Sequence, residues 1–366
     1  MIILGIETSC DETSASVVKD GREILSQVIS SSLNLHTQTG GVIPEVAARE
    51  QIKAILPVLE QAMADSLQTT DYGKQKAVDR RPWTVDHIDA IAVTVGPGLI
   101  GSLLVGVETA KTLAYVWTKP IIPVNHLPGH LYANWLTGEN EPEFPAVGLV
   151  VSGGHTDLVL MKNHGEMEFI GGTRDDAAGE AFDKSARLLG LPYPGGPSIA
   201  AEAAKFQITN DKLQIKLPRP LLDEKTFDFS FSGLKTAVLR DVNRLKESHI
   251  SHQNPSSHVQ LPTSTIAYEV QEAITDVLVQ KTLRAVKHYG VSTLLVAGGV
   301  AANSRLKEKF EQAILDLDLN LDFRVPPPKL CTDNASFIAA CAFFSQTPVP
   351  WNKIDANPSL QITEKP

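Results

Sequence analysis

The chain has 366 residues, of which 43% are hydrophobic and 20% charged, and its formal net charge is −9. This is the composition of a folded protein, and the length exceeds the roughly 250–300 residues at which one hydrophobic core usually stops growing, so two domains with a cleft between them are expected. The acidic balance argues against a protein that coats nucleic acid non-specifically, although local basic stripes can still bind it.

The cysteines and the first residues indicate a cytoplasmic protein. Cys10, Cys331 and Cys341 form an odd set without a C-x-x-C spacing, which suits a reducing compartment better than a disulfide framework. The run Met1–Ile6 has no basic residue and leads directly into Glu7, so it predicts a first strand rather than a signal peptide. No apolar run reaches the roughly 18 residues needed to span a membrane.

The first third of the chain predicts three strands, followed by alternating helices and strands. The strands are expected at Ile2–Ile6, Ala15–Val18, Ile24–Ser30, Ile91–Val95 and Ile121–Val124, and the helices at Pro44–Ala64 and Leu103–Trp117.

The chain then starts again with three apolar runs and alternating elements. Strands are expected at Val147–Val151, Asp157–Met161, Met167–Ile170, Thr293–Ala297 and Phe323–Val325, and helices at Asp176–Leu189, Phe231–Asn243, Ser264–Tyr289, Ser304–Leu315 and Asn334–Phe344. Two three-strand openings predict a duplicated α/β domain with its hinge between Val124 and Pro145. Polar stretches at Thr69–Asp86 and Lys246–Pro262 are interpreted as surface insertions, and the segment after Phe344 as a mobile end.

His126 and His130 are the strongest indication of chemistry, because residues four apart share one helix face and can bind one metal ion. Pro128 between them is tolerated in the first turn of a helix, where its missing N–H has no partner to lose. Asp333 is the best candidate for a third ligand, although an Asp just before a helix can equally serve as its N-cap. Two histidines and one carboxylate leave coordination positions open, as in catalytic iron and zinc sites.

Small-residue turns carry the other candidate groups. Gly153-Gly154 and Gly298-Gly299 each follow a predicted strand, and without a Cβ their backbone can approach a phosphate closely, so turns on opposite lobes would clamp one nucleotide. Asp11 and Glu12 lie in the first hairpin, where carboxylates can reach a cleft or simply shape a turn. Cys10 is expected to be packed rather than nucleophilic.

These motifs resemble the TsaD family, formerly called Gcp or O-sialoglycoprotein endopeptidase, and the resemblance covers residues 1–345. It rests on Gly5–Thr13, Gly40–Glu45, Gly96–Leu99, His126–His130, Val151–Thr156, Asp175–Lys184, Tyr193–Pro197, Asp228–Lys235, Ala297–Asn303 and Cys331–Asn334. It implies the actin-like (ASKHA) fold of actin, sugar kinases and Hsp70: two lobes with mixed sheets flanked by helices and a central cleft. The lobes would comprise residues 1–124 plus 326–345 and residues 125–325, followed by a tail, 346–366.

The resemblance implies transfer of a threonylcarbamoyl group from threonylcarbamoyl-AMP to the exocyclic amine of the adenosine 3′ of the anticodon, in tRNAs that read codons beginning with A. One divalent ion, iron (Fe²⁺) before zinc, would be held by His126, His130 and Asp333. Asp11 would accept a proton or orient the tRNA. The adenylate would be bound by Val150, Val151, Ser152, Gly153, Gly154, Asp183, Gly196 and Asn303.

The same resemblance implies partners: a TsaB-like paralogue, a small TsaE-like ATPase, and a TsaC-like synthase that supplies the adenylate. The chain departs from the family pattern at Thr39, at Gln51, where His is common, and at Pro128. These departures affect the shape of the cleft, and contacts with tRNA or partners, more than the chemistry.

Two alternatives remain at this point. A sugar or acid kinase of the same fold class would share the glycine turns but has no need for the histidine pair, and a scaffold subunit would need neither. A peptidase would need an H-E-x-x-H helix or a convincing nucleophile, and the sequence has neither.

Overall fold

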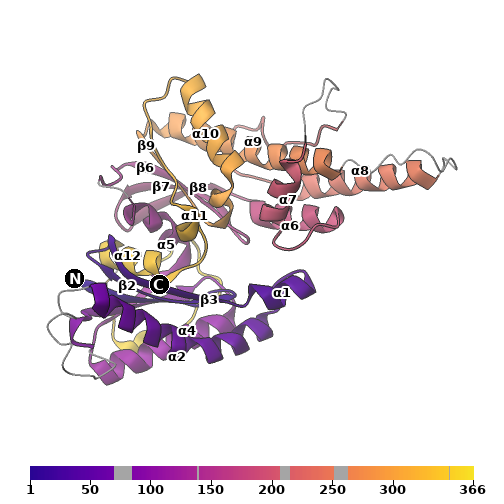
Figure 1. Cartoon of the computed structure of the whole chain (residues 1–366). Helices are drawn as coiled ribbons and strands as arrows, with labels where there is room; N and C mark the ends of the chain where they lie inside the picture. The colour runs from indigo at the N-terminus through magenta and orange to yellow at the C-terminus, as the bar shows by residue number, and fades with distance from the viewer. Residues whose placement is uncertain (70–84, 138–139, 207–214, 251–262, 346) are drawn as a thin grey trace.

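The computed structural model describes residues 1–69, 85–137, 140–206, 215–250, 263–345 and 347–366. Its described residues form two lobes, each built on a five-stranded sheet, one above the other in Figure 1. None of the described helices combines the length and the hydropathy needed to cross a membrane.

The first sheet has the strand order β3-β2-β1-β4-β5, in which β1, β2 and β3 are antiparallel and β4 and β5 run parallel to β1. Its strands are β1 (Ile2–Glu7), β2 (Glu12–Lys19), β3 (Glu23–Ser31), β4 (Ala90–Gly96) and β5 (Ile121–Asn125). Every residue of β4 and β5 is buried, as expected for parallel strands covered on both faces. The helices of this lobe are α1 (Leu33–Thr39), α2 (Pro44–Thr69) and α4 (Ile100–Trp117), with the short turn η1 (Val85–His87).

The second sheet repeats this arrangement, with the order β10-β9-β6-β7-β8. Its strands are β6 (Ala146–Val151), β7 (Thr156–Asn163), β8 (Glu166–Gly172), β9 (Thr293–Ala297) and β10 (Asp322–Arg324). The helices around it are α6 (Ala178–Leu188), α7 (Gly195–Ala203), α8 (Ser232–Ile250), α9 (Thr263–Tyr289) and α10 (Ser304–Asp316), with the turn η3 (Gly299–Ala302). The two sheets with matching strand orders confirm the duplicated actin-like α/β fold.

Two helices, with short turns beside them, fill the space between the sheets, as Figure 1 shows. They are α5 (His126–Tyr132) and α12 (Ala335–Ser345), accompanied by η2 (Ala133–Trp135) and α11 (Pro328–Cys331). Each helix follows the last strand of one sheet and packs against the other: α5 contacts β6 and β9, α12 contacts β1 and β2, and the two helices contact each other. One hydrophobic cluster therefore includes buried residues of both sheets, such as Ile3 and Leu295.

The sequence prediction of the tail is wrong. Residues 347–366, which include the turn η4 (Trp351–Lys353), pack along the first lobe, and Ile354, Leu360 and Ile362 are buried there. These buried apolar side chains hold the segment against the lobe. The prediction of a mobile end relied on the prolines of the segment and gave these side chains no weight. The lobe boundaries at 124, 125, 325 and 326 stay a prediction.

Other differences concern helices. The prediction missed α1 and α7, because both are short and begin or end at Gly-rich turns, and α2 continues to Thr69 rather than ending near Ala64. Of the two predicted insertions, residues 70–84 and 251–262 lie outside the described residues.

Candidate metal centre and substrate cleft

The histidine pair lies at the start of α5, where β5 enters the space between the lobes. Asn125 is the N-cap, and its Oδ1 accepts the N–H of Leu127 at 3.1 Å. Pro128 lies in the first turn, whose N–H groups have no intrahelical partner, so the helix forms as the sequence predicts. Both histidine rings are buried and lie next to Phe337 of α12.

Asp333 precedes α12 but does not cap it. Oδ1 of the buried Asn334 accepts the N–H groups of Ser336 at 3.1 Å and Phe337 at 3.3 Å. Asn334 is thus the N-cap of α12. The Asp333 carboxylate is not used as a cap and is free to face the histidines.

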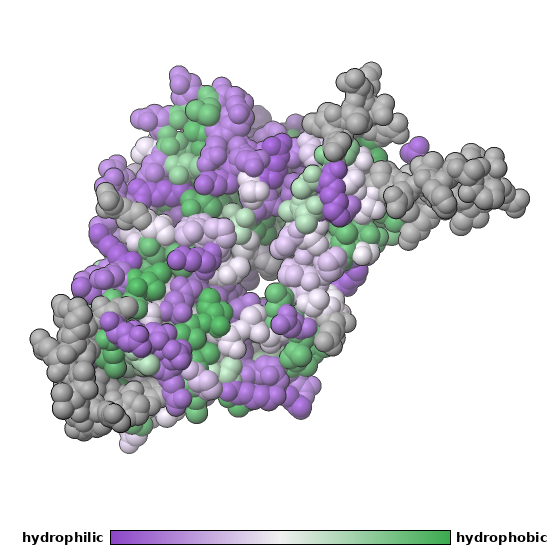
Figure 2. All heavy atoms as spheres, in the orientation of Figure 1, coloured by the Kyte–Doolittle hydropathy of each residue, from purple (hydrophilic) through white to green (hydrophobic). Residues whose placement is uncertain are grey.

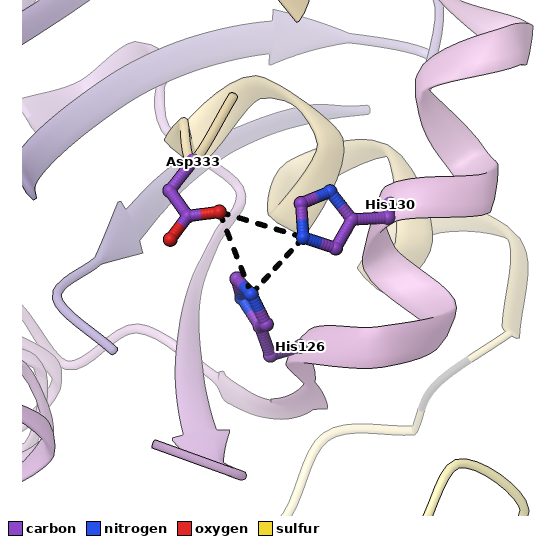
Figure 3. A group of neighbouring side chains, drawn as sticks. All are labelled: His126, His130 and Asp333. Carbon is purple, nitrogen blue, oxygen red and sulfur yellow. Dashed lines mark hydrogen bonds and ion pairs between the residues drawn. The ribbon is translucent and has the colours of Figure 1, made fainter. Parts of the chain in front are cut away.

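Two ring nitrogens and one carboxylate oxygen converge on one point, as Figure 3 shows. Oδ1 of Asp333 lies 3.6 Å from Nε2 of His126 and 3.4 Å from Nε2 of His130, and the two Nε2 atoms are 3.1 Å apart. Ligands about 2.1 Å from a tetrahedral ion lie about 3.4 Å from each other, so these separations fit one ion. The donor set of two imidazoles and one carboxylate suits iron or zinc and leaves positions open.

Glu7, which the sequence reasoning missed, fixes the orientation of His126. Its fully buried carboxylate lies 3.0 Å from Nδ1 of His126 and also accepts bonds from the Ser9 N–H and the Thr94 hydroxyl, both at 2.5 Å. Burial alone would raise the pKa of Glu7, but His126 and these hydrogen bonds lower it.

Because an ionised carboxylate only accepts, Nδ1 of His126 carries a proton toward Glu7, and Nε2 is the ring atom that faces Asp333. A carboxylate behind a metal-binding histidine is the usual way to fix its tautomer. The sequence did contain a signal for this role of Glu7, because a charged residue that directly follows the apolar run Ile2–Ile6 is expected to be buried and therefore to need a partner.

Two of the three residues, His126 and Asp333, line a cavity of about 450 Å³ between the lobes. Figure 2 shows the molecule hollowed where the two lobes meet. Residues of both lobes line this cavity. They include Ser9, Cys10, Asp11, Glu12, Pro97, Gly98, Leu99, His126, Ser152, Gly153, Gly154, His155, Tyr193, Pro194, Gly299 and Asp333. Asp11, Ser152, Gly153, Gly154, His126 and Asp333 were predicted from the sequence, and the structure brings them together in this one cavity.

Glycines form the side of the cavity that belongs to the second lobe. A Cβ added at Gly153, Gly154 or Gly299 would meet no atom within 4 Å, so open space lies in front of each. The expectation that the two Gly-Gly turns lie on opposite lobes is wrong, because they follow the neighbouring strands β6 and β9 of one sheet. A Cβ at Gly298 would lie 2.3 Å from the carbonyl oxygen of Val151, so the two turns touch.

Carboxylates dominate the side that belongs to the first lobe, and none of the described residues lining the cavity is Lys or Arg. Burial raises the pKa of Glu12 to about 10, with Asp333 and Asp11 adding to the effect. Burial also raises the pKa of Asp333 to about 6, where His126 opposes the shift and Glu7 and Asp11 reinforce it. Crowded carboxylates of this kind are stabilised in their charged form by a cation.

A family model described as TsaD, tRNA N6-adenosine threonylcarbamoyltransferase, matches residues 23–340. The chain belongs to this family. Curated members with the same description include proteins of Thermomicrobium roseum, 48% identical over 94% of this chain and 92% of the relative, and of Bacillus cereus, 46% identical over 99% and 96%. Among solved structures, HypF of T. kodakarensis is similar in fold, with a TM-score of 0.54 at 13% identity over 93% of this chain and 47% of that chain.

Membership in the threonylcarbamoyltransferase family makes the chain an enzyme of tRNA modification. It decides against the kinase and scaffold alternatives, which the glycine turns alone left open.

The remaining predicted substrate residues do not line the cavity. Val150 and Val151 are buried within β6, and Oδ1 of Asp183 accepts the Gly195 N–H at 2.6 Å at the start of α7. Gly196 faces open space, and Asn303 caps α10 through the Leu306 N–H at 3.2 Å. Gly299, which belongs to a predicted Gly-Gly turn, lines the cavity instead, together with Tyr193 and Pro194, for which the sequence gave no separate reason.

Gln51 of α2 contacts the turn that carries Cys10 and Asp11. Nε2 of Gln51 donates to the carbonyls of Cys10 at 3.0 Å and Glu12 at 2.9 Å, and these bonds hold the turn in place. Gln51 therefore still supplies a hydrogen-bond donor at the position where the family commonly has His. Burial raises the pKa of Cys10, and Asp11 and Asp333 add to the shift, so the thiol is a poor nucleophile as expected.

Proposed function

We propose that this enzyme transfers the threonylcarbamoyl group from threonylcarbamoyl-AMP to the exocyclic amine of the adenosine 3′ of the anticodon, in tRNAs reading codons that begin with A. The single observation that carries the proposal is that His126 and Asp333, which lie together with His130, line the same cavity as the open glycine turns. The family supplies the reaction class, and the cavity supports the proposal because it places candidate metal ligands opposite backbone that an anion can approach.

The adenylate would bind with its phosphate against the glycine side. In the Ser152–Gly154 turn, the N–H of Ser152 already donates to the His155 carbonyl at 2.8 Å, so it is not available to a phosphate. The N–H groups of Gly153 and Gly154 have no acceptor among the described residues. Without a Cβ in front of them, they can donate to a phosphate or to the developing oxyanion.

The metal ion, Fe²⁺ in first place and zinc in second, would be held by His126, His130 and Asp333. When bound, it supplies a Lewis acid that polarises the carbamoyl carbonyl. This matters because an aromatic exocyclic amine is a poor nucleophile. The buried Glu7 keeps Nε2 of His126 available as a ligand.

The transfer forms a bond between the adenosine nitrogen and the carbamoyl carbon, and breaks the bond from that carbon to the phosphate oxygen. AMP leaves, and the attacking nitrogen loses one proton. Asp11, a largely buried carboxylate in the cavity wall, is the proposed acceptor of this proton.

The proposed partners are tRNA, a TsaB-like paralogue, a TsaE-like ATPase and a TsaC-like synthase. Two observations support a need for partners. The chain carries a net charge of −9, which weakens tRNA binding by a single subunit. The helices α2 and α4 pack together and present the exposed apolar residues Ile52, Leu56, Ile100 and Leu104.

The test is a transfer assay with the purified protein, its predicted partners, threonylcarbamoyl-AMP and unmodified tRNA. Digested nucleosides are analysed by mass spectrometry, with His126→Ala in parallel. We expect threonylcarbamoyladenosine from the wild type and none from the variant. Absence of product from a fully assembled, metal-loaded complex would contradict the proposal.

A further inference from the structure

The C-terminal segment runs along the first lobe toward the metal centre. The N–H of Val349 donates to the carbonyl of Ile121 at 2.9 Å, which adds a bridge to the open edge of β5. The segment then buries Ile354, Leu360 and Ile362, and Figure 1 places its end beside α5 and α12. It therefore follows the strand that leads into the metal-binding helix.

The middle of the segment supports one wall of the cavity. The N–H of Asn357 donates to the carbonyl of Val95 at 2.7 Å, and the N–H of Gly98 donates to the carbonyl of Pro358 at 3.3 Å. A Cβ at Gly96 would lie 1.8 Å from the carbonyl oxygen of Asn357, so the two backbones are in direct contact. Because Pro97 and Gly98 line the cavity, the segment lies directly behind its wall.

The end of the segment holds the residue that starts α5. The side-chain amide of Asn125 donates to the carbonyls of Gln361 at 2.7 Å and Glu364 at 3.1 Å, which uses both of its hydrogens. With the NH₂ group fixed in this way, Oδ1 can only face the helix, where it accepts the Leu127 N–H. Asn125 is 1% exposed, so water cannot substitute for these partners.

We propose that residues 357–364 are a positioning element of the metal centre. They fix the amide of Asn125, the amide fixes the first turn of α5, and the first turn aims the ring of His126 at His130 and Asp333. Metal sites need their ligands held within about 0.5 Å by a supporting shell of packing and hydrogen bonds. The inference rests on the metal site of the proposed function.

Two variants test this inference in the full chain. Truncation after Ser359 removes both acceptor carbonyls, and Asn125→Asp keeps the capping oxygen but loses both donors. Control variants are truncation after Glu364, which removes only exposed residues, and Trp351→Ala, which alters the segment at an exposed side chain away from Asn125. Circular dichroism and thermal melting establish which variants fold.

The readouts are Zn²⁺ affinity, measured by competition with a chromogenic chelator, and the visible absorption spectrum with Co²⁺ bound. We expect both test variants to lose at least about tenfold in Zn²⁺ affinity and to show an altered Co²⁺ spectrum, as when the support of a metal ligand is removed. The controls should match the wild type.

The outcomes separate the two proposals. Folded test variants with wild-type affinity and spectrum would overturn the positioning role while leaving the metal site intact. A wild-type chain that binds neither ion would overturn the metal site and this inference with it. If the truncated chain does not fold, Asn125→Asp alone decides.

Discussion

The two halves of the molecule share one architecture but carry opposite chemistry at matching turns. Glu7 and Val151 each end the first strand of a sheet and pair with Ser14 and Thr156 in the second strand. The Ser14 hydroxyl accepts the N–H of Ala335 at 3.0 Å, and the Thr156 hydroxyl accepts that of Ala178 at 2.9 Å. In both halves, therefore, a hydroxyl of the second strand binds the first residue of a helix, α12 in one case and α6 in the other.

The turns themselves differ in what they present to the cavity. The first half has Cys10-Asp11-Glu12 after its buried glutamate, whereas the second half has Ser152-Gly153-Gly154 after a valine. Carboxylates favour a cation, while bare backbone N–H groups favour an anion. The comparison teaches that one architecture, used twice, carries two different turns, which give the cavity one side that favours a cation and one side that favours an anion.

The three candidate metal ligands come from both halves. After the last strand of the first sheet comes α5 with both histidines, and after the last strand of the second sheet comes Asp333 with α12. Because each helix packs against the opposite sheet, ligands from the two halves meet.

Removing one ligand from each half is expected to have the largest effect. His126→Ala and Asp333→Ala should each lower the transfer rate by about 10³-fold or more, because each removes a proposed ligand of the ion that would polarise the carbonyl. Mass spectrometry of the modified nucleoside measures the rate, and chelator competition measures Zn²⁺ affinity. His288→Ala, at an exposed position near the end of α9, is the matched control. A wild-type transfer rate in either ligand variant would show that the reaction does not depend on these three residues.

Asp11→Asn tests the acidic turn apart from the metal. We expect the transfer rate to fall by about 10²-fold, which is typical of losing a general base, with Zn²⁺ affinity unchanged. A parallel loss of Zn²⁺ affinity would instead assign the Asp11 carboxylate to the cation side as an electrostatic support.

Gly153→Val tests the glycine turn in the same way. Its backbone lies outside the left-handed region and its Cβ would meet open space, so the chain should fold while the side chain enters the anion side of the cavity. We expect KM for threonylcarbamoyl-AMP to rise about tenfold, since a lost phosphate contact removes binding more than chemistry. An unchanged KM, measured beside unchanged Zn²⁺ affinity, would show that the adenylate does not approach this turn.

The sequence predicts the duplicated strands, the histidine helix and the glycine turns, because each depends on local periodicity or on a local turn. It does not predict Glu7 as the partner of His126, since the two are 119 positions apart and only the fold brings them together. The sequence leaves the choice between ligand and cap at Asp333 open for a different reason: Asp333 and Asn334 are adjacent and both are good N-caps, and only the structure shows that Asn334 takes the cap. The docking of the tail depends on isolated apolar residues such as Ile354 and Leu360, which have no period to reveal them.

The smallest expected effect concerns a charge that only the second half contains. Asp157 in β7 occupies the position that Ala15 holds in β2, and burial raises the pKa of Asp157 to about 6 from an ordinary 3.8. Between these values the unfolded chain loses the proton that the folded chain keeps, so stability falls as pH rises from about 4 to 6 and stays lower above it.

Asp157→Asn removes this titration, and it should raise the free energy of unfolding by about 1 kcal/mol at pH 7.5, or Tm by about 2 °C. The difference should shrink below pH 6 and vanish below pH 4, where Asp157 is protonated in both states. Thermal melts of both proteins from pH 4 to 8 measure it, and a difference that does not change with pH would show that the side chain shape, rather than the buried charge, distinguishes the two halves at this position.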